Sequence, residues 1–170
     1  SLNVFLVNSL YLRKKKNISI TEFYTIFIWH FLLSIIYFFY VATFGGDANG
    51  YLEYAKNFAG IQGTRPFTLG NGTTFILNLV SIFHNKLKLD LINIISIFNF
   101  IGFVGLIYFF QTLKNISKSI DTKNLFVKNL PYLIIFIPSL SFWTSGIGKE
   151  PFTFLSISLF LYSIHKQKCN

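Results

Sequence analysis

Two short stretches of the chain carry ionisable residues where the surrounding sequence is almost wholly apolar. Lys149 and Glu150 stand in a Gly- and Ser-rich turn between the apolar runs 130–140 and 152–164, and Asp47 directly follows another such run. Charged side chains at membrane depth must face protein or water rather than lipid, so by default they mark a functional site. A carboxylate near a lysine is suited to taking a proton from a hydroxyl group while an anion is held beside it.

Asp47 stands in the segment Gly45-Gly46-Asp47. The two glycines allow the chain to turn sharply where it leaves the apolar run, and a short helix is expected after the turn. The Asp47 carboxylate can cap that helix, because aspartate is a favoured N-cap residue. It can also accept a proton from an incoming hydroxyl group or bind a divalent cation. The two roles are compatible, and the sequence leaves both open.

The turn at Lys149 and Glu150 can hold an anion. Pro151 is suited to the first turn of a helix, so that the helix amide groups and the Lys149 ammonium would both face a bound phosphate. Alternatively, Lys149 and Glu150 form a salt bridge at the membrane interface, with Trp143 as an aromatic anchor. Arg65, in a Gly-rich stretch, either grips a phosphate with its guanidinium group or is solvated.

The composition is that of a membrane protein. Of the 170 residues 52% are hydrophobic and only 12% are charged, against about 25% charged in a soluble domain. The net charge of +9 does not indicate nucleic acid as a partner, because the basic residues lie in short bursts between apolar runs. The single Cys169 excludes an intrachain disulfide, and no metal-ligand cluster or nucleotide-binding loop is found. The start at Ser1 and the absence of Met indicate a fragment, and the Phe-, Ile-, Asn- and Lys-rich composition indicates a bacterial source.

The apolar runs predict an all-α, polytopic membrane helix bundle, because a membrane-crossing helix needs about 20 apolar residues. The expected spans are 22–44, 89–113, 130–147 and 151–165, with a partial span at 1–12. His30, Ser34 and Tyr37 share one face of the first full span, where hydrogen bonds between helices are expected.

Two further helices, 48–59 and 73–85, are expected in the first outer loop. The second has a polar stripe formed by Asn71, Thr74, Asn78, Ser81 and Asn85. A helix with opposed polar and apolar faces prefers to lie in the membrane interface, and the alternative is a short span packed inside the bundle. If 73–85 does not cross, ten of the 15 basic residues fall on one side and five on the other. Since cytoplasmic loops carry an excess of Lys and Arg, we expect a multi-pass protein of the cytoplasmic (inner) membrane, with 45–90 and 145–150 outside the cytoplasm.

The pattern resembles the first part of the GT-C-type glycosyltransferases, multi-span enzymes that take sugars from polyprenyl-phosphate donors. The resemblance covers about residues 23–164. It consists of Asp47 in the first outer loop, the short helix after it, the juxtamembrane helix before the next span, and the block Pro-Ser-x-x-Phe-Trp-x-Ser-Gly-x-x-Lys-Glu at 138–150. The block and the loop 45–51 also resemble segments of bacterial membrane proteins linked to sugar transfer.

The resemblance implies that Asp47 is catalytic and that Arg65 and Lys149 handle the donor phosphate. Tyr51, Trp143 and Glu150, which stand in the same segments, are also expected to bind the substrate. Many relatives have a second acidic residue beside the first; here Ala48 and Asn49 follow, so a two-carboxylate metal site within this loop is not expected. No cofactor is expected, and a divalent cation stays an open alternative.

The resulting expectation is transfer of a sugar from a polyprenyl-phosphate donor in the membrane lipid to a glycan or lipid acceptor outside the cytoplasm. Two alternatives remain open at this point. One is a polysaccharide polymerase. The other is a non-catalytic transporter or flippase component, in which Lys149 and Glu150 line a pathway.

Overall fold

The protein is built from helices. The structure, a computed structural model, describes residues 18–58, 70, 72–120 and 124–168, and within these residues every regular element is helical. In chain order the elements are α2 (Ile20–Phe44), α3 (Asp47–Phe58), α4 (Thr73–Ser81), the π-helix η1 (Ile82–Lys86), α5 (Leu91–Ser119), α6 (Leu125–Ile135), α7 (Pro138–Thr144) and α8 (Glu150–Lys168). The predicted all-α helix bundle is confirmed. The expected partial span 1–12 lies outside the described residues.

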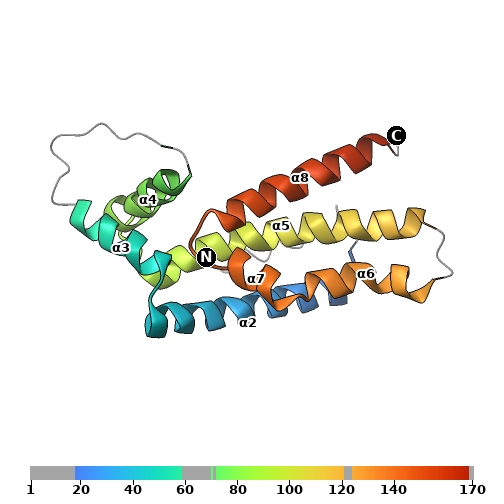
Figure 1. Ribbon diagram of the computed structural model, residues 1–170, viewed down its shortest axis with the longest axis horizontal. Coiled ribbons are helices and arrows are strands. Elements are labelled where there is room, and N and C mark those ends of the chain that lie inside the picture. The colour runs from blue at the N-terminus through green and yellow to red at the C-terminus, as the bar shows by residue number, and fades with distance from the viewer. Residues whose placement is uncertain (1–17, 59–69, 71, 121–123, 169–170) are drawn as a thin grey trace.

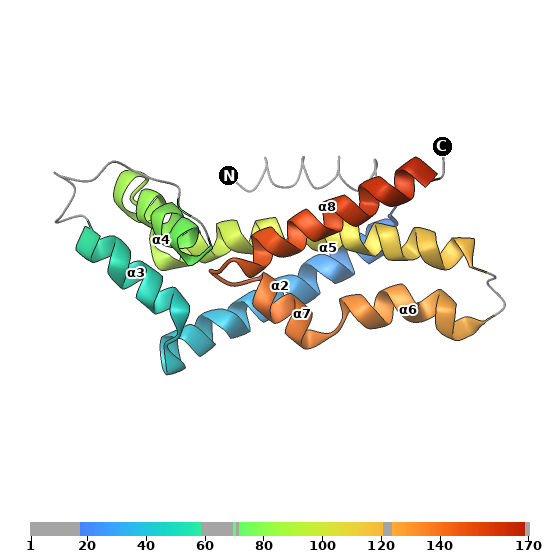
Figure 2. The same ribbon diagram turned by 45° about the horizontal axis from the view of Figure 1, so that its top comes forward.

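Helix α5 is the centre of the bundle. Helices α2, α6 and α8 all pack against it and run along its length (Figures 1 and 2). Helices α3 and α4 pack against each other beyond the end of α2 (Figure 1). We call this end of the bundle the α3 end, and the opposite end, where α5 finishes and α6 begins, the α6 end.

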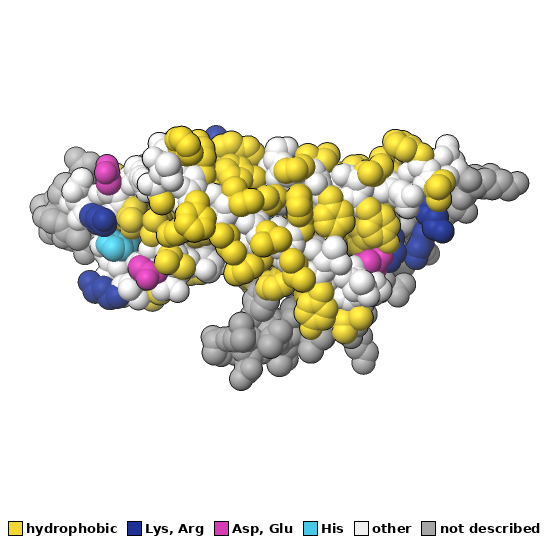
Figure 3. Space-filling view, turned by 90° about the horizontal axis from the view of Figure 1, so that it is seen from below, with side chains coloured by type: hydrophobic (Ala, Val, Ile, Leu, Met, Phe, Trp, Pro, Cys, Tyr) yellow, Lys and Arg dark blue, Asp and Glu magenta, His cyan; other side chains and the backbone are white. Residues whose placement is uncertain are grey.

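In the described part of the chain, three helical stretches are long and apolar enough to cross a membrane: Ile20–Phe44, Leu91–Ser119 and Leu125–Thr144. On the face shown in Figure 3, hydrophobic side chains cover the middle and charged side chains gather toward the two ends. This is the distribution that a bilayer requires, because charged groups are costly in hydrocarbon. The chain is therefore a membrane protein. Helix α8 has 19 residues but is not one of the three, since Glu150 and Lys166 shorten its apolar part.

The third of these stretches is broken in the middle. Helix α6 begins at Leu125, earlier than expected, and ends at Ile135, and α7 starts at Pro138. A proline lacks the N–H that would continue the helix and is favoured at a first helical position, which explains the break. The helix also stops at Thr144 rather than 147, because the chain turns between Ser145 and Lys149.

Small residues on α5 allow two other segments to approach it closely. A Cβ atom added at Gly102 would lie 1.9 Å from the carbonyl oxygen of Thr144, and one at Gly105 would lie 3.1 Å from the Cα of Leu155. Helices in membranes associate through such close packing at small residues. These contacts fix the height of the α7–α8 turn along α5.

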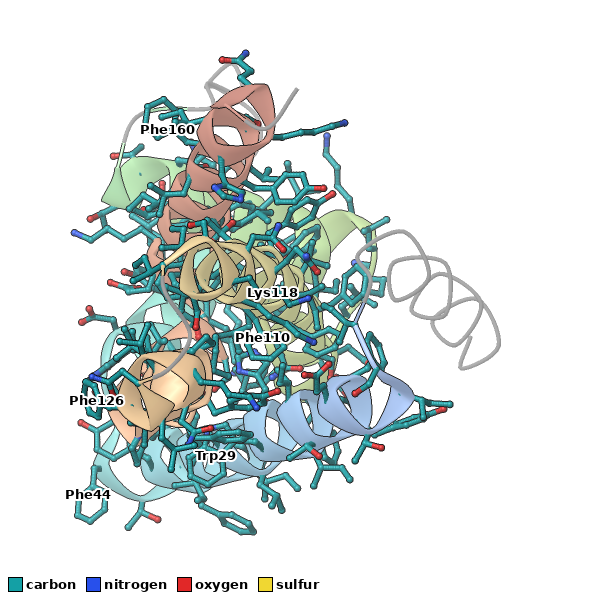
Figure 4. All side chains as sticks on the ribbon, turned by 90° about the vertical axis from the view of Figure 1, so that its right-hand side faces the viewer. Trp29, Phe44, Phe110, Lys118, Phe126 and Phe160 are labelled. Carbon is teal, nitrogen blue, oxygen red and sulfur yellow. The ribbon has the colours of Figure 1, made fainter. Side chains whose placement is uncertain are left out.

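Large aromatic side chains fill the space between the helices. Phe110 is fully buried, and Figure 4, viewed from the α6 end, shows it in the middle of the bundle, whereas Phe44, Phe126 and Phe160 point outward. Two polar side chains of α2 that lie inside the bundle bond to backbone carbonyl groups. His30 Nε2 donates to the carbonyl of Asn99 in α5 at 3.1 Å, which confirms the expected inter-helix bond for this residue. The Tyr37 hydroxyl donates at 3.3 Å to the carbonyl of Ile147, in the turn after α7 rather than in a helix.

The polar stripe of α4 faces protein. Asn78 and Ser81 are buried, and Asn85 Nδ2 donates to the carbonyl of Ala55 in α3 at 2.8 Å. The sequence left open whether this helix lies in the membrane interface or packs inside the bundle. In the structure Asn78, Ser81 and Asn85 of the stripe lie against protein. Residues 73–86, helical as α4 and η1, are not among the stretches that qualify to cross a membrane.

At the α6 end, one carboxylate joins three helices. Glu22 completes a capping box with Ser19 at the start of α2. Its carboxylate accepts from Lys114 Nζ of α5 at 2.7 and 2.8 Å and from the Tyr132 hydroxyl of α6 at 2.5 Å. Because Glu22 and Lys114 are largely shielded from solvent, this charge-assisted cluster fixes how α2, α5 and α6 meet.

Candidate functional site

A cavity of about 190 Å³ lies at the α3 end, where the end of α2, the start of α3 and the α7–α8 turn meet. Its polar and aromatic side chains come from separate parts of the chain: Tyr37 and Tyr40 from α2, Asp47 and Tyr51 from α3, and Trp143 and Glu150 from either side of the α7–α8 turn. Because Asp47 and Glu150 both line it, we call this cavity the carboxylate pocket. Four of the sequence-predicted site residues thus lie together.

Asp47 reaches the pocket through the turn before α3. Gly45 and Gly46 have φ angles of 78° and 115°, which only glycine adopts without strain. Asn49 Nδ2 donates to the carbonyl of Val41 at 3.1 Å, which ties the start of α3 to the end of α2. The expected sharp turn is confirmed.

The cap position of α3 is occupied by Gly46. The carbonyl of Gly46 accepts hydrogen bonds from the amides of Asn49 and Gly50, so Asp47 is the first residue inside the helix. The N-cap role considered for Asp47 is therefore wrong. A carboxylate in the first turn is still favoured by the helix dipole, and among the described residues none donates a hydrogen bond to it. Its oxygens are available to a ligand.

Helix α3 is held by one buried face. Ala48 and Ala55 have no exposed surface, and Tyr51 and Leu52 pack on the same core cluster. This i, i+3, i+4, i+7 spacing is that of a helix face turned toward the protein interior. The docked face brings Tyr51 to the pocket beside Asp47.

Glu150 enters the pocket from the start of α8. The Lys149 carbonyl accepts the first helical bond, from the amide of Thr153 at 2.9 Å. The Glu150 carboxylate folds back over Gly148, where an added Cβ would lie 2.1 Å from Oε2. Any larger residue at position 148 would displace this carboxylate.

The charges that line the pocket affect the pKa of the Tyr51 phenol. Its pKa is raised above the ordinary tyrosine value, first because burial disfavours the phenolate and second because Asp47 and Glu150 are negatively charged nearby. The phenol therefore stays protonated and can donate a hydrogen bond. The pocket combines two acceptor carboxylates with phenol groups that can donate hydrogen bonds.

The α7–α8 turn packs on α2 before that helix ends. Gly146, in the α7–α8 turn, packs so tightly on the Tyr37 ring that an added Cβ would lie 2.2 Å from Cζ. Tyr37 precedes the end of α2 at Phe44 by seven residues, or roughly 10 Å at the helical rise. The turn therefore sits roughly 10 Å below the end of α2.

Lys149 lines a different space. An open groove of about 610 Å³ runs between α5, α6–α7 and α8, and we call it the apolar groove. Its walls include Phe109, Ile137, Leu140 and Phe154, and Lys149 is the one cation among the described residues that line it. The expectation that Asp47 and Lys149 share one pocket is wrong in this respect, because the charged neighbour of Asp47 is Glu150.

The two spaces have a common wall. Trp143 and Glu150 line both the carboxylate pocket and the apolar groove. Trp143 is half exposed, so it separates the groove from the pocket without sealing either. Arg65, the other predicted phosphate ligand, lies outside the described residues.

A divalent cation would find only part of its ligand set here. Among the described residues, no three His, Cys, Asp or Glu side chains gather in one place. Asp47 and Glu150 supply two carboxylates, and Mg²⁺ is commonly held by one or two carboxylates together with substrate phosphate oxygens and water. The second carboxylate comes from α8, not from the loop after Asp47.

Sequence reasoning did not assign Tyr37, Tyr40 or Gly148 to the site. Tyr37 was expected only as an inter-helix bonding residue, and nothing in the spacing linked it to residue 147. No protein-family model matches the chain, and neither a curated protein nor a solved structure matches it at a significant level.

Proposed function

We propose that this chain is the part of a membrane glycosyltransferase that binds a polyprenyl-phosphate sugar and activates the acceptor hydroxyl group. The observation that carries the proposal is the common wall of Trp143 and Glu150 between the carboxylate pocket and the apolar groove. A lipid-linked sugar needs such an arrangement, because its two ends differ in polarity. The proposed location is the outer face of the bacterial cytoplasmic membrane.

The apolar groove suits the lipid part of the donor. Its lining is almost wholly apolar, and it is open along its length, so an isoprenoid chain could enter it from the bilayer. Lys149 offers an ammonium group in the same groove, and the amides at the start of α8 add the positive end of a helix dipole. A phosphate held there would lie beside the Glu150 wall.

The carboxylate pocket suits the transfer step. Asp47 accepts the proton of the acceptor hydroxyl as its oxygen attacks the anomeric carbon. The bond from that carbon to the phosphate oxygen breaks, and the polyprenyl phosphate leaves with the electron pair. Lys149 and the α8 N-terminus stabilise the departing charge. The protonated Tyr51 phenol can donate a hydrogen bond to a sugar oxygen.

The test uses the intact protein in lipid vesicles with a radiolabelled polyprenyl-phosphate sugar. Asp47→Asn should reduce transfer by about 10²–10⁴-fold, the usual contribution of a general base. Glu53→Gln is the matched control, because Glu53 is an exposed carboxylate of the same helix that does not line the pocket. Thermal unfolding in detergent verifies that both variants are folded.

Transfer by Asp47→Asn at the wild-type rate would remove Asp47 from the catalytic role. Movement of the labelled lipid across the bilayer without any sugar transfer would instead support a flippase. Lys149→Gln should weaken donor binding, seen as a higher KM, whereas Lys56→Gln on exposed α3 surface should not. Equal KM values for the two lysine variants would contradict donor binding in the apolar groove.

A further inference from the structure

A second polar cavity lies at the α6 end, opposite the carboxylate pocket. It measures about 530 Å³ and lies between the end of α5 and the start of α6. Its charged and polar lining includes Lys114 and Lys118 from α5 and Lys128, Asn129 and Tyr132 from α6. Figure 4 looks onto this end of the molecule, where Lys118 is labelled. We call it the lysine cavity.

The wall of the lysine cavity is fixed by a proline and a serine. Pro131 lies inside α6 and has no N–H to give to the carbonyl four residues earlier. That carbonyl, of Val127, accepts instead from the Ser117 hydroxyl of α5 at 2.7 Å. The bond holds α5 and α6 together beneath the lysines, so the cavity has a defined shape.

The cavity has a surplus of positive charge. Lys114 is paired with Glu22, but Lys118 and Lys128 have no carboxylate partner among the described residues. Lys118, in the last turn of α5, is at least favoured by the helix dipole. Lys128 stands near the N-terminus of α6, where the dipole repels a cation. An anion bound between them would compensate both charges.

The two hydroxyl groups in the lining of the cavity are already used. The Ser117 hydroxyl donates to Val127 and the Tyr132 hydroxyl donates to Glu22. Among the residues that the structure describes, the ammonium groups of Lys118 and Lys128 and the exposed amide of Asn129 are left to offer hydrogen bonds. Several donors that line one cavity match a group with several negative oxygens, such as a phosphate.

The surroundings of the cavity are apolar. Leu125 and Phe126, in the first turn of α6, are 69% and 63% exposed, and Ile120 at the end of α5 is half exposed. Such side chains next to a membrane-spanning stretch contact acyl chains. A phosphate that is itself attached to acyl chains would satisfy the lysines and cover these residues at once.

We propose that the lysine cavity binds the phosphate of an anionic phospholipid headgroup, at the end of the bundle opposite the carboxylate pocket. Lys118 and Lys128 contact the phosphate oxygens, Asn129 donates to the headgroup, and the acyl chains lie along Leu125 and Phe126. Basic pockets between membrane helices bind anionic headgroups in this way. The site is separate from the proposed sugar transfer and does not depend on it.

The test measures lipid binding to the intact chain by native mass spectrometry and by thermal unfolding in detergent with added lipid. Phosphatidylglycerol should bind and raise the unfolding temperature, whereas phosphatidylcholine should do so much less. Lys118→Gln combined with Lys128→Gln should weaken phosphatidylglycerol binding roughly 30-fold, since each lysine near an anionic surface is worth about fivefold. Both side chains are exposed, so the unfolding temperature without lipid should not change.

The matched control is Lys56→Gln combined with Lys88→Gln, which removes the same charge from exposed positions at the α3 end. An equal loss of binding in this control would overturn the proposal, because it would show attraction to net charge only. Inorganic phosphate tests whether the cavity binds a free phosphate ion instead of a lipid headgroup. If inorganic phosphate stabilises the protein through Lys118 and Lys128 and phosphatidylglycerol does not, the lipid is the wrong ligand and the proposal fails.

Discussion

The hydroxyl of Tyr37 in α2 donates a hydrogen bond to the carbonyl oxygen of Ile147 in the α7–α8 turn at 3.3 Å. This bond joins two walls of the carboxylate pocket that lie far apart in the sequence. The Tyr37 ring also lies directly against Gly146, where a Cβ would approach Cζ to 2.2 Å. The position of the turn, and with it that of Glu150, depends on the absence of a side chain at residue 146.

We expect Gly146→Ala to destabilise the protein. The added methyl group must displace the Tyr37 ring or the turn, and overpacking of this kind costs about 1–3 kcal/mol. The measurement is thermal unfolding in detergent. Gly50→Ala is the control, because a Cβ at Gly50 in α3 meets nothing within 4 Å. That change should stabilise the helix by about 0.5–1 kcal/mol. Equal unfolding temperatures for the two variants would contradict the contact.

The pKa of Tyr51 reports whether Asp47 faces the pocket. Burial and the two carboxylates raise this pKa, so Asp47→Asn should lower it toward the ordinary value of about 10. The measurement is an NMR titration of ¹³C-labelled tyrosine, with Tyr51→Phe to assign the signal. Glu53→Gln should leave the titration in place. A Tyr51 pKa that is unchanged in Asp47→Asn would mean that Asp47 points elsewhere.

The raised pKa of Tyr51 also determines how the stability of the protein changes with pH. The folded-state pKa of Tyr51 lies above its unfolded value, so the unfolded chain loses this proton first as the pH rises. The stability associated with Tyr51 is therefore complete below about pH 10 and is lost as the pH rises through the folded-state pKa. In Asp47→Asn the loss should be smaller, which unfolding measured between neutral pH and pH 11 would detect.

The long helices could be predicted from the sequence because the length of an apolar run gives the approximate length of the helix. The run before Gly45 is α2, and Asp90 caps α5, accepting from the Asn93 amide at 2.9 Å. The break between α6 and α7 was missed. Hydropathy counts apolar side chains and takes no account of the N–H that Pro138 lacks.

The site was only partly predictable. Asp47 and Glu150 could be named, but not which of Lys149 and Glu150 would face Asp47. Neighbouring residues on a helix point about 100° apart, so the answer depends on the rotation of α8 about its axis. Packing at Gly105, against Phe154 and Leu155, sets that rotation. In the same way, the polar stripe of α4 could be recognised, but its direction depends on α3.

The Glu22 cluster should act as one unit. Glu22→Gln leaves Lys114 without its counter-charge in a poorly solvated place, at a cost of about 2–3 kcal/mol, below the value for a fully buried pair because both side chains are partly exposed. Glu22→Gln combined with Lys114→Gln should cost less than the sum of the single changes. Unfolding of all three variants in detergent gives the coupling free energy, and strictly additive costs would contradict the cluster.

Tyr132→Phe measures the contribution of the Tyr132–Glu22 hydrogen bond to stability separately from that of the Glu22–Lys114 ion pair. It removes only the donor to Glu22, so a loss of about 1.5–3 kcal/mol is expected for a bond to a charged group. Tyr40→Phe is the control, since Tyr40 lies near the other end of α2 from Glu22 and its ring packs on Phe142. If Tyr132→Phe costs no more than Tyr40→Phe, the 2.5 Å contact contributes nothing to stability.

The arrangement of the ends predicts which positions are accessible from one side of a membrane. Lys56 in α3 and Lys86 in η1 lie at the α3 end, and Ser119 closes α5 at the α6 end. In sealed vesicles of a variant with Cys169 replaced by serine, single cysteines at 56 and 86 should react with a membrane-impermeant maleimide from the same side. A cysteine at 119 should react only from the opposite side, because α5 is long and apolar enough to cross between them.

Labelling of positions 56 and 86 from opposite sides would mean that α4 and η1 cross the membrane. Labelling of position 119 from the same side as positions 56 and 86 would mean that α5 does not cross. Either result would place Asp47 and the lysine cavity differently with respect to the bilayer.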